Sequence, residues 1–382
     1  MNRFQLGIAF LIASGALGPI GCSAPLEPLP RCDAEAERAG RSICGVRNPE
    51  DLALLPGRRW LLVSEMAPME ATAEEGSAPP QAGSLLAIRL SDGKRRRLYP
   101  TDLDAHRDAG SGAAVRASLG DPGCSGPPDP AVFLPHGVDV GGGPGGEARV
   151  AVVNHGGREA IEIFEIRFQR GPVLEWRGCV PMPEGLMAND VAWLPDGGFV
   201  VTNFAPVLEG SGLAALWTGF EILTGRETGA VYRWTPGAGL ALIEGSEGSA
   251  PNGIAVAPDG RTILVAEWGA DSVYRLRIDG EGGGRRRSVD LEHSPDNLSW
   301  MRDGRLLVAA QAGGLTAALA CNEIEEVGCD IEHAVYAIDP VSLEATRLFV
   351  GRGAASVALE AGDEILVGFF KGDQIERVAR AD

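Results

Sequence analysis

Apolar and polar residues alternate in short runs along most of the chain, and turns rich in glycine and proline separate these runs. The stretch PNGIAVAPDG, residues 251–260, shows the unit: a polar start, an alternating run, and a turn at Pro258-Asp259-Gly260. Alternation over about four to eight residues predicts a β-strand with one buried face. No convincing amphipathic helix separates the runs, so the pattern predicts an all-β chain.

The same unit occurs six times, with starts separated by roughly 45 to 85 residues, a spacing that suits propeller blades with loop insertions. Each copy reads as a strand, a turn containing glycine and a second strand, often followed by a third. The copies begin at Glu50 (EDLALLPG), His136 (HGVDV), Asn189 (NDVAWLPDGG), Asn252 (NGIAVAPDG), Asp296 (DNLSWMRDGR) and Ala355 (ASVALEAGDE).

Six units of three or four antiparallel strands predict a six-bladed β-propeller over residues 46–382. A two-sheet sandwich is the alternative, but it gives no reason for a polar residue at the start of each unit. In a propeller, the innermost strands line a central tunnel, and their first residues meet at its mouth. The expected ring consists of Glu50, His136, Asn189, Asn252, Asp296 with Asn297, and Ser356.

Composition narrows the function classes. The 382 residues include 53 glycines and 26 prolines, as a turn-rich β-protein requires, and 52 acidic against 34 basic residues give a net charge of −18. Such a field repels nucleic acid and anionic lipid and attracts divalent cations. We therefore expect no nucleic-acid partner, and the sequence leaves the oligomeric state open.

The ring offers only oxygen ligands apart from His136: two carboxylates and three amide carbonyls. This donor set suits Ca²⁺, whereas Mg²⁺ prefers more water and Zn²⁺ prefers nitrogen or sulfur. Asparagine and aspartate also begin ordinary turns, but that explanation does not account for the same position in several blades. The predicted calcium ligands are Glu50, Asn189, Asn252, Asp296 and Asn297.

Two histidines lie in one predicted hairpin. His136 opens the innermost strand in PHGVDV, and His155 follows the next strand in VVNHGG. A neutral imidazole beside a metal-bound carbonyl can deprotonate water or relay the proton outward. No GxSxG elbow is present, which argues against a serine hydrolase of the α/β type.

The N-terminal stretch MNRFQLGIAFLIASGALGPIGC has a basic start, an apolar run too short to span a bilayer, and small residues before Cys22. It resembles a bacterial lipoprotein signal over residues 1–21, with Cys22 as the lipidated residue and residues 22–45 as a tether. An ordinary secretory peptide cut nearby is the alternative. Either way we expect export, and lipidation would anchor the protein to a bacterial membrane on its periplasmic or cell-surface side.

Six further cysteines suggest disulfides in an exported protein, and six cysteines allow fifteen connectivities. Cys321 and Cys329 enclose a short loop and are expected to pair. For the remaining four we adopt Cys32 with Cys44 and Cys124 with Cys179, one choice among those still open. No spacing matches a zinc site. Residues 205–228 are more apolar than an exposed loop and suggest a lid over the pocket or a membrane-facing segment.

The ordered set of EDLALLPG, PHGV, VVNH, NDVAWLPDGGFVVTN, PNGIAVAPDG, SPDN and ASVALEAGDEILVG resembles the calcium-dependent paraoxonase/arylesterase family. That family belongs to a wider group with the SMP-30 gluconolactonases and strictosidine synthase-like propellers. The resemblance implies that the five predicted ligands bind a catalytic calcium. It also implies a second, structural calcium held by Asp51, Asp190 and the backbone carbonyl of Val138. His136 would be the general base and His155 its partner.

The chain departs from the family at one informative place. Members tend to carry an aspartate after the Thr-Asn of VVTN, and Phe204 stands there in this sequence. The resemblance predicts a calcium-dependent lactonase or arylesterase. An SMP-30-like sugar lactonase and a non-catalytic, calcium-stabilised binding propeller at the cell surface are the alternatives. A strictosidine synthase-like condensing enzyme would need a catalytic acid, and the ring argues against it.

Overall fold

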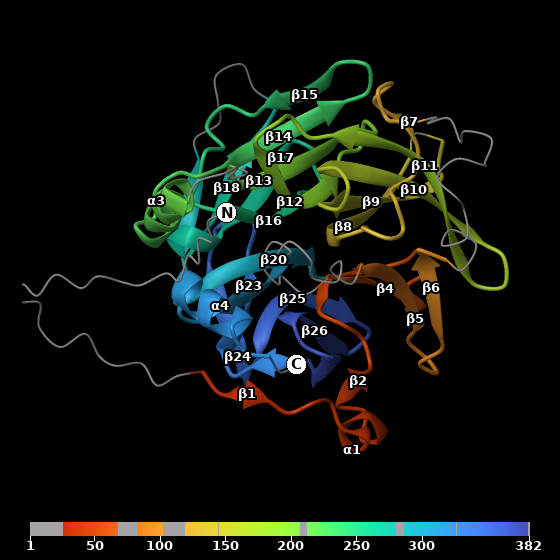
Figure 1. Ribbon diagram of the computed structural model, residues 1–382, viewed down its shortest axis with the longest axis vertical. Coiled ribbons are helices and arrows are strands. Elements are labelled where there is room, and N and C mark those ends of the chain that lie inside the picture. Colours follow the sequence, from red (N-terminus) through yellow and green to blue (C-terminus); the bar gives the residue numbers. More distant parts are fainter. Residues whose placement is uncertain are drawn as a thin grey trace, which may run out of the picture.

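The computed structural model describes residues 26–67, 82–101, 119–143, 145–206, 212–279, 286–325 and 327–380. Six antiparallel blades surround one centre (Figure 1). Their inner strands contact one another in cyclic order, and the sixth contacts the first. The predicted six-bladed β-propeller is therefore confirmed. The proposed signal, residues 1–21, and Cys22 lie outside the described residues.

Each blade consists of strands that are mostly consecutive in the chain, ordered below from the innermost strand outwards. The first three blades comprise β3 (Pro49–Leu54), β4 (Trp60–Glu65), β5 (Ser84–Arg89) and β6 (Arg95–Tyr99); β8 (Pro135–Gly142), β9 (Ala148–Asn154), β10 (Ala160–Phe168) and β11 (Pro172–Pro181), with β7 (Leu119–Gly120) beside β11; and β12 (Leu186–Trp193), β13 (Phe199–Pro206), β14 (Ala230–Thr235) and β15 (Gly239–Leu242).

The other three blades follow the same plan. They comprise β16 (Pro251–Val256), β17 (Thr262–Glu267), β18 (Ser272–Arg277) and β19 (Arg287–Asp290); β20 (Ser294–Trp300), β21 (Leu306–Gln311), β23 (Glu332–Ile338) and β24 (Ala345–Arg352); and β25 (Ala354–Ala361), β26 (Glu364–Lys371), β27 (Gln374–Ala379) and β2 (Ser42–Cys44).

The ring of blades is closed by a strand from the other end of the chain. β2 pairs antiparallel with β27, with Ser42 opposite Glu376. This strand lies within the range predicted as a tether, and it completes the sixth blade. Because β2 directly precedes the first blade in the chain and pairs with the last blade, it ties the two ends of the described chain together.

The apolar core lies between neighbouring blades, so each central strand is buried on both faces. In β4, Leu61 and Val63 pack in the cluster shared with the sixth blade, whereas Leu62 packs toward the second blade. All three side chains are fully buried. Alternate residues of a strand point to opposite faces, which explains why the second strands read as continuous apolar runs such as WLLV.

Among the described residues, four short helical segments interrupt the strands, contrary to the expectation that none would. They are α1 (Ala34–Arg38), α3 (Gly212–Leu223), the 3₁₀ turn η1 (Trp268–Ala270) and α4 (Gly314–Asn322). In α3, within the apolar segment 205–228, Leu213, Trp217 and Leu223 are exposed while Ile222 is buried. Because both faces of α3 are apolar, the sequence has no helical alternation to detect. None of the described helices is long and apolar enough to cross a bilayer.

All three predicted disulfides are confirmed: Cys32–Cys44, Cys124–Cys179 and Cys321–Cys329. The last of these joins the end of α4 to β22 (Gly328–Cys329), and β22 pairs with β1 (Pro28–Leu29) near the start of the described chain. The disulfide therefore links α4, which borders the tunnel mouth, to the N-terminal segment.

Candidate active site and cation-binding ring

The six inner strands share one irregularity at the predicted ring position. In each blade, the pairing between the first and second strands shifts register at this point, which is typical of a β-bulge. The shifts lie between Pro49 and Asp51, Pro135 and Val138, Ala188 and Val191, Pro251 and Ile254, Pro295 and Leu298, and Ala355 and Val357. A bulge re-aims the side chains it contains, and this explains why the polar start is repeated in every blade.

The bulges bring the predicted residues together at the floor of one cavity of about 490 Å³. Glu50, Asn189, Asn252 and Asp296 line it, together with His136 and His155. Asn297 and Ser356 are buried beside this floor, and both donate hydrogen bonds to the backbone oxygen of Glu50, at 3.3 and 2.6 Å respectively.

Several oxygens of the floor are buried without a hydrogen-bond partner. They are Glu50 Oε2 and the Oδ1 atoms of Asn189, Asn252 and Asn297. An unsatisfied buried polar group costs about 1 to 3 kcal/mol, so four of them in one place require an explanation. Hard oxygens of this kind are the ligands that Ca²⁺ takes, so the residues present fit a calcium ion.

The amide oxygens are an essential part of this donor set. Among the described residues, no group of three or more His, Cys, Asp or Glu side chains is placed to hold a metal ion. A cation at the floor would therefore depend on the three asparagines as well as on Glu50 and Asp296. This composition favours an oxygen-seeking ion over zinc.

Neighbouring side chains orient the two carboxylates. Asn297 Nδ2 donates to Glu50 Oε1 at 2.8 Å, and Gln311 Nε2 donates to Asp296 Oδ2 at 2.5 Å. Sequence reasoning missed Gln311, which also accepts a hydrogen bond from Trp268 Nε1 at 3.1 Å. Burial and the negative charge of Glu50 raise the pKa of Asp296 to about 8. A bound cation would offset the repulsion between the two carboxylates.

The predicted histidine pair is formed in the structure. His136 Nδ1 lies 2.9 Å from His155 Nε2, and His136 Nε2 lies 3.3 Å from Glu50 Oε1. Burial lowers the pKa of His136, but the carboxylates of Glu50, Asp296 and Asp190 together outweigh burial and raise that pKa to about 9. The two histidines thus extend from the oxygen ring to the loop that follows β9 in the second blade.

A further carboxylate, Glu159, completes this chain of hydrogen bonds, and sequence reasoning missed it. Its Oε1 and Oε2 atoms lie 3.0 and 2.8 Å from His155 Nδ1. The intervening loop turns back through Gly156 and Gly157: a Cβ on Gly156 would lie 1.5 Å from the backbone oxygen of Val132, and Gly157 has φ of +73°. The signal in the sequence was the HGGRE motif, in which two glycines allow the tight return.

A second group of carboxylates lies beyond the ring. Asp51 Oδ2 accepts from Val138 N at 2.7 Å, and Asp190 Oδ2 accepts from Ile254 N at 2.8 Å, so each acid joins its blade to another. Burial and the charge of Glu50 raise the pKa of Asp51 well above its usual range, and burial and the charge of Asp51 do the same for the pKa of Asp190. Two buried carboxylates that repel each other form a favourable environment for a cation.

The walls of the cavity are apolar. Phe204 and Trp268 lie with their ring centroids 6.0 Å apart, and α4 contributes Leu315 and Leu319. The remaining apolar wall residues are Met66, Ala67, Leu134, Pro135, Met187, Ala188, Ala318 and Phe370. The site therefore combines a charged floor with apolar walls, as ligand pockets commonly do.

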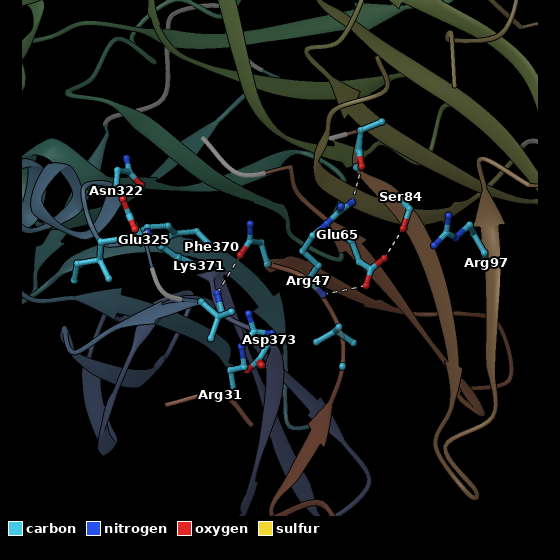
Figure 2. Close-up of a pocket in the computed structure, with 18 of the residues that line it drawn as sticks. Arg31, Arg47, Glu65, Ser84, Arg97, Asn322, Glu325, Phe370, Lys371 and Asp373 are labelled. Atoms are coloured by element: carbon cyan, nitrogen blue, oxygen red, sulfur yellow. Dashed lines mark hydrogen bonds between the residues drawn. The ribbon is translucent and has the colours of Figure 1, made fainter. Parts of the chain in front are cut away.

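A larger cavity of about 810 Å³ lies beside this one, and Asn322 and Phe370 line both. Figure 2 shows Arg47, Glu65 and Ser84 along its wall, where Ser84 Oγ donates to Glu65 Oε2. Asp373 accepts a hydrogen bond from Cys32 N at 2.9 Å. Because these carboxylates are already engaged and the histidine pair lies elsewhere, we assign the chemistry to the smaller cavity.

The fold and the residues at the floor of the smaller cavity thus define a six-bladed propeller with a polar site at its tunnel mouth. Residues 150–327 match the family model described as the SMP-30/gluconolactonase/LRE-like region. The match runs from the second blade to the fifth. None of the curated proteins is significantly similar to the chain.

Solved structures resemble the propeller over most of its length. A gluconolactonase from Xanthomonas campestris has 16% identity and a TM-score of 0.50, covering 95% of this chain and 99% of its own. A luciferin-regenerating enzyme has 13% identity and a TM-score of 0.51, covering 90% and 96%. Regucalcin, a calcium-binding protein from Agrobacterium tumefaciens, has 12% identity and a TM-score of 0.49, covering 89% and 93%. Identities this low show a common fold alone.

Proposed function

We propose that the protein is a calcium-dependent hydrolase of lactones or activated aryl esters. One observation carries this proposal: four unpartnered buried oxygens and a hydrogen-bonded histidine pair lie at or beside the floor of a single apolar-walled cavity. The residues that would hold a catalytic calcium are Glu50, Asn189, Asn252, Asp296 and Asn297. Asp51, Asp190 and the carbonyl of Val138 would hold a second, structural ion.

The bound ion would supply a positive charge that polarises the substrate carbonyl and stabilises the developing oxyanion. The chain itself supplies the base. His136 Nε2 faces the ring, so once a bound cation offsets the carboxylates that raise the pKa of His136, this nitrogen is placed to accept a proton from a water that attacks the carbonyl carbon. His155 Nε2 lies 2.9 Å from His136 Nδ1 and would stabilise the positive charge that forms on His136. General base catalysis of this kind contributes about 10²- to 10⁴-fold.

The cavity walls favour a substrate with an apolar acyl or aryl group. A sugar lactone carries several hydroxyl groups, and each would lose water without gaining a partner on walls formed by Phe204, Trp268 and Leu319. An SMP-30-like sugar lactonase remains the second candidate, because the family match includes gluconolactonases. Preference between an aliphatic lactone and a sugar lactone separates the two candidates.

Turnover by the purified protein tests the proposal. Aliphatic lactones, gluconolactone and phenyl acetate should be compared with calcium, after EDTA, and after calcium is restored. We expect hydrolysis that EDTA abolishes and calcium restores, with apolar substrates preferred. A calcium-dependent rise in melting temperature without turnover on any substrate would instead identify a non-catalytic binding propeller, and no response to calcium would refute the metal site.

We also propose that the protein is exported and lipid-anchored through Cys22. Three disulfides support export, because such bonds persist mainly in oxidising compartments. Mass spectrometry of the membrane fraction from a bacterial host should find Cys22 acylated. A soluble mature protein without acyl groups would indicate the ordinary secretory peptide.

A further inference from the structure

We propose that Glu159 is a positioning residue: it fixes which ring nitrogens of His155 and His136 carry protons, so that the unprotonated nitrogen of His136 faces the oxygen ring. We call this order of protons the direction of the His136–His155 relay. This inference rests on the proposed function for its catalytic meaning. It stands on geometry: the Glu159 carboxylate lies 2.8 Å from His155 Nδ1, and His155 Nε2 lies 2.9 Å from His136 Nδ1.

The direction follows from the chemistry of the groups. An ionised carboxylate only accepts hydrogen bonds, so the nitrogen facing Glu159 must carry a proton. A neutral His155 protonated at Nδ1 has its lone pair on Nε2, which must then accept from His136 Nδ1–H. A neutral His136 protonated at Nδ1 has its lone pair on Nε2. That atom is the one nearest the ring, where a base is needed.

Glu50 at the opposite end favours the reverse arrangement. Its Oε1 atom lies 3.3 Å from His136 Nε2 and would accept a proton carried there. That oxygen already accepts a hydrogen bond from Asn297 Nδ2 at 2.8 Å. Glu159 lies 2.8 Å from His155 Nδ1, closer than the 3.3 Å between Glu50 Oε1 and His136 Nε2. This shorter contact favours the direction that Glu159 sets. A cation bound to Glu50 would weaken its pull on the proton further, so metal binding and Glu159 act in the same sense.

The structure holds Glu159 in place through the next blade. Its Oε1 atom also accepts from Ala188 N at 2.8 Å, one residue before the ring member Asn189. The side chain is 22% exposed and lies outside the set of residues that line the pocket. Glu159 therefore acts through His155 and has no contact with substrate, which defines a positioning role.

The relay performs one balanced step. The water oxygen forms a bond to the carbonyl carbon, the carbonyl π electrons move to its oxygen, and the proton of the water passes to His136 Nε2. The imidazolium formed keeps its Nδ1–H bond to His155, whose Nδ1–H remains bonded to the Glu159 carboxylate. The negative charge at Glu159 thus stabilises positive charge two rings away. Phe204, which follows the Thr-Asn of VVTN, supplies no such charge.

Glu159→Ala tests the assignment by kinetics. We expect kcat with a lactone or aryl ester at saturating calcium to fall about 10- to 100-fold, the usual cost of losing a group that orients a functional histidine. KM should stay within about twofold, because Glu159 does not line the pocket. Formate should restore part of the lost kcat, since it can place a carboxylate beside His155. A structural defect would not respond to formate.

Glu162→Gln is the matched control from the same hairpin. Glu162 is buried and engaged by Arg158 Nε and Trp176 Nε1 at 2.7 and 2.8 Å, away from the histidines. This variant should lower the melting temperature and leave kcat unchanged. A loss of kcat in Glu162→Gln equal to that in Glu159→Ala would assign the effect to the hairpin as a whole and overturn the proposal.

A second readout does not need turnover. Long-range ¹H–¹⁵N spectra of the wild-type full chain should show His155 protonated at Nδ1 and His136 at Nδ1 when calcium is present. Glu159→Ala should shift His155 toward the Nε2–H form. If the wild type hydrolyses no substrate, the proposed function fails, and the spectra still decide the tautomers. Unchanged tautomers together with unchanged kcat in Glu159→Ala would refute the positioning role.

Discussion

Asn297 Nδ2 donates a hydrogen bond of 2.8 Å to Glu50 Oε1, although the two residues lie 247 positions apart in the sequence. Asn297 belongs to the fifth blade and Glu50 to the first, so the bond passes over the sixth. The bond fixes the orientation of the amide, and the amide oxygen of Asn297 has no hydrogen-bond partner. The same bond therefore joins two blades and presents an oxygen to the candidate cation.

Replacing one ring asparagine should remove the calcium response at little structural cost. Asn189 Oδ1 is buried and unpartnered, so Asn189→Ala removes no hydrogen bond made by this oxygen. A ligand at about 100 times its dissociation constant stabilises a protein by about 2.7 kcal/mol. We expect calcium to raise the melting temperature of the wild type and to raise that of Asn189→Ala much less, measured by calorimetry with and without EDTA.

Asn203 is the control for this experiment. It lies in the same blade, and its Nδ2 donates to the backbone oxygens of Met187 and Ala205 at 3.2 and 2.9 Å. Asn203→Ala should therefore destabilise the metal-free protein by about 1 to 3 kcal/mol and keep the full calcium response. Equal calcium responses in Asn189→Ala and the wild type would exclude Asn189 as a ligand.

His136→Gln should separate catalysis from metal binding. The amide of a glutamine side chain cannot accept a proton from water, so we expect kcat to fall about 100-fold or more, the contribution typical of a general base. The calcium-dependent rise in melting temperature should persist, because the oxygen ring is unchanged. Steady-state kinetics and calorimetry on the same preparation make the comparison. Full activity in this variant would show that His136 is not the base.

The ring residues were predictable because the propeller repeats them. One asparagine at the start of a strand carries no information, but Asn189 and Asn252 at equivalent positions of different blades do. The repeat also indicated the tunnel, since only a closed ring of blades brings strand starts together. The bulges that aim these side chains were not predictable, because a register shift depends on both strands of a pair.

Gln311 and Glu159 were missed for a related reason. Neither occupies the repeated position: Gln311 ends a second strand, and Glu159 lies in a loop after His155. Their contacts depend on how the strand end and the loop approach the floor. The helix α3 was missed because Leu216 and Phe220 are exposed on a face that would ordinarily be polar. In each case, tertiary contacts determine a feature that the local sequence pattern does not specify.

The number of bound ions should depend on Asp190. Burial and the charge of Glu50 raise the pKa of Asp51, and burial and the charge of Asp51 raise the pKa of Asp190. We expect isothermal titration to find two calcium ions in the wild type and one in Asp190→Asn. Asp139 is the control, because it is only half-buried and lies beside the predicted set, whereas Asp51 and Asp190 are buried. Asp139→Asn should still bind two ions. A single ion in the wild type would refute the structural site.

Stability should fall in acid because of a histidine that is not a member of the ring. His333 is fully buried, its Nδ1 bonds to the backbone oxygen of Gly353 at 3.0 Å, and Gly351 leaves room for the ring. Burial lowers the pKa of His333 from 6.5 to about 4, with smaller effects from His293, Arg352 and Glu332. The unfolded chain therefore binds a proton more readily than the folded one between these values.

The sign of the effect follows directly. The contribution of His333 is fully present above pH 6.5 and is lost as the pH falls toward 4, because protonation then favours the unfolded chain. A pKa difference of this size corresponds to about 2 to 3 kcal/mol of unfolding free energy at pH 4.5. Urea unfolding of the wild type and His333→Gln at pH 7.5 and 4.5 measures it. The wild type should lose more stability than the variant by about that amount, since carboxylates contribute equally to both. Parallel losses in the two proteins would show that His333 titrates normally in the folded state.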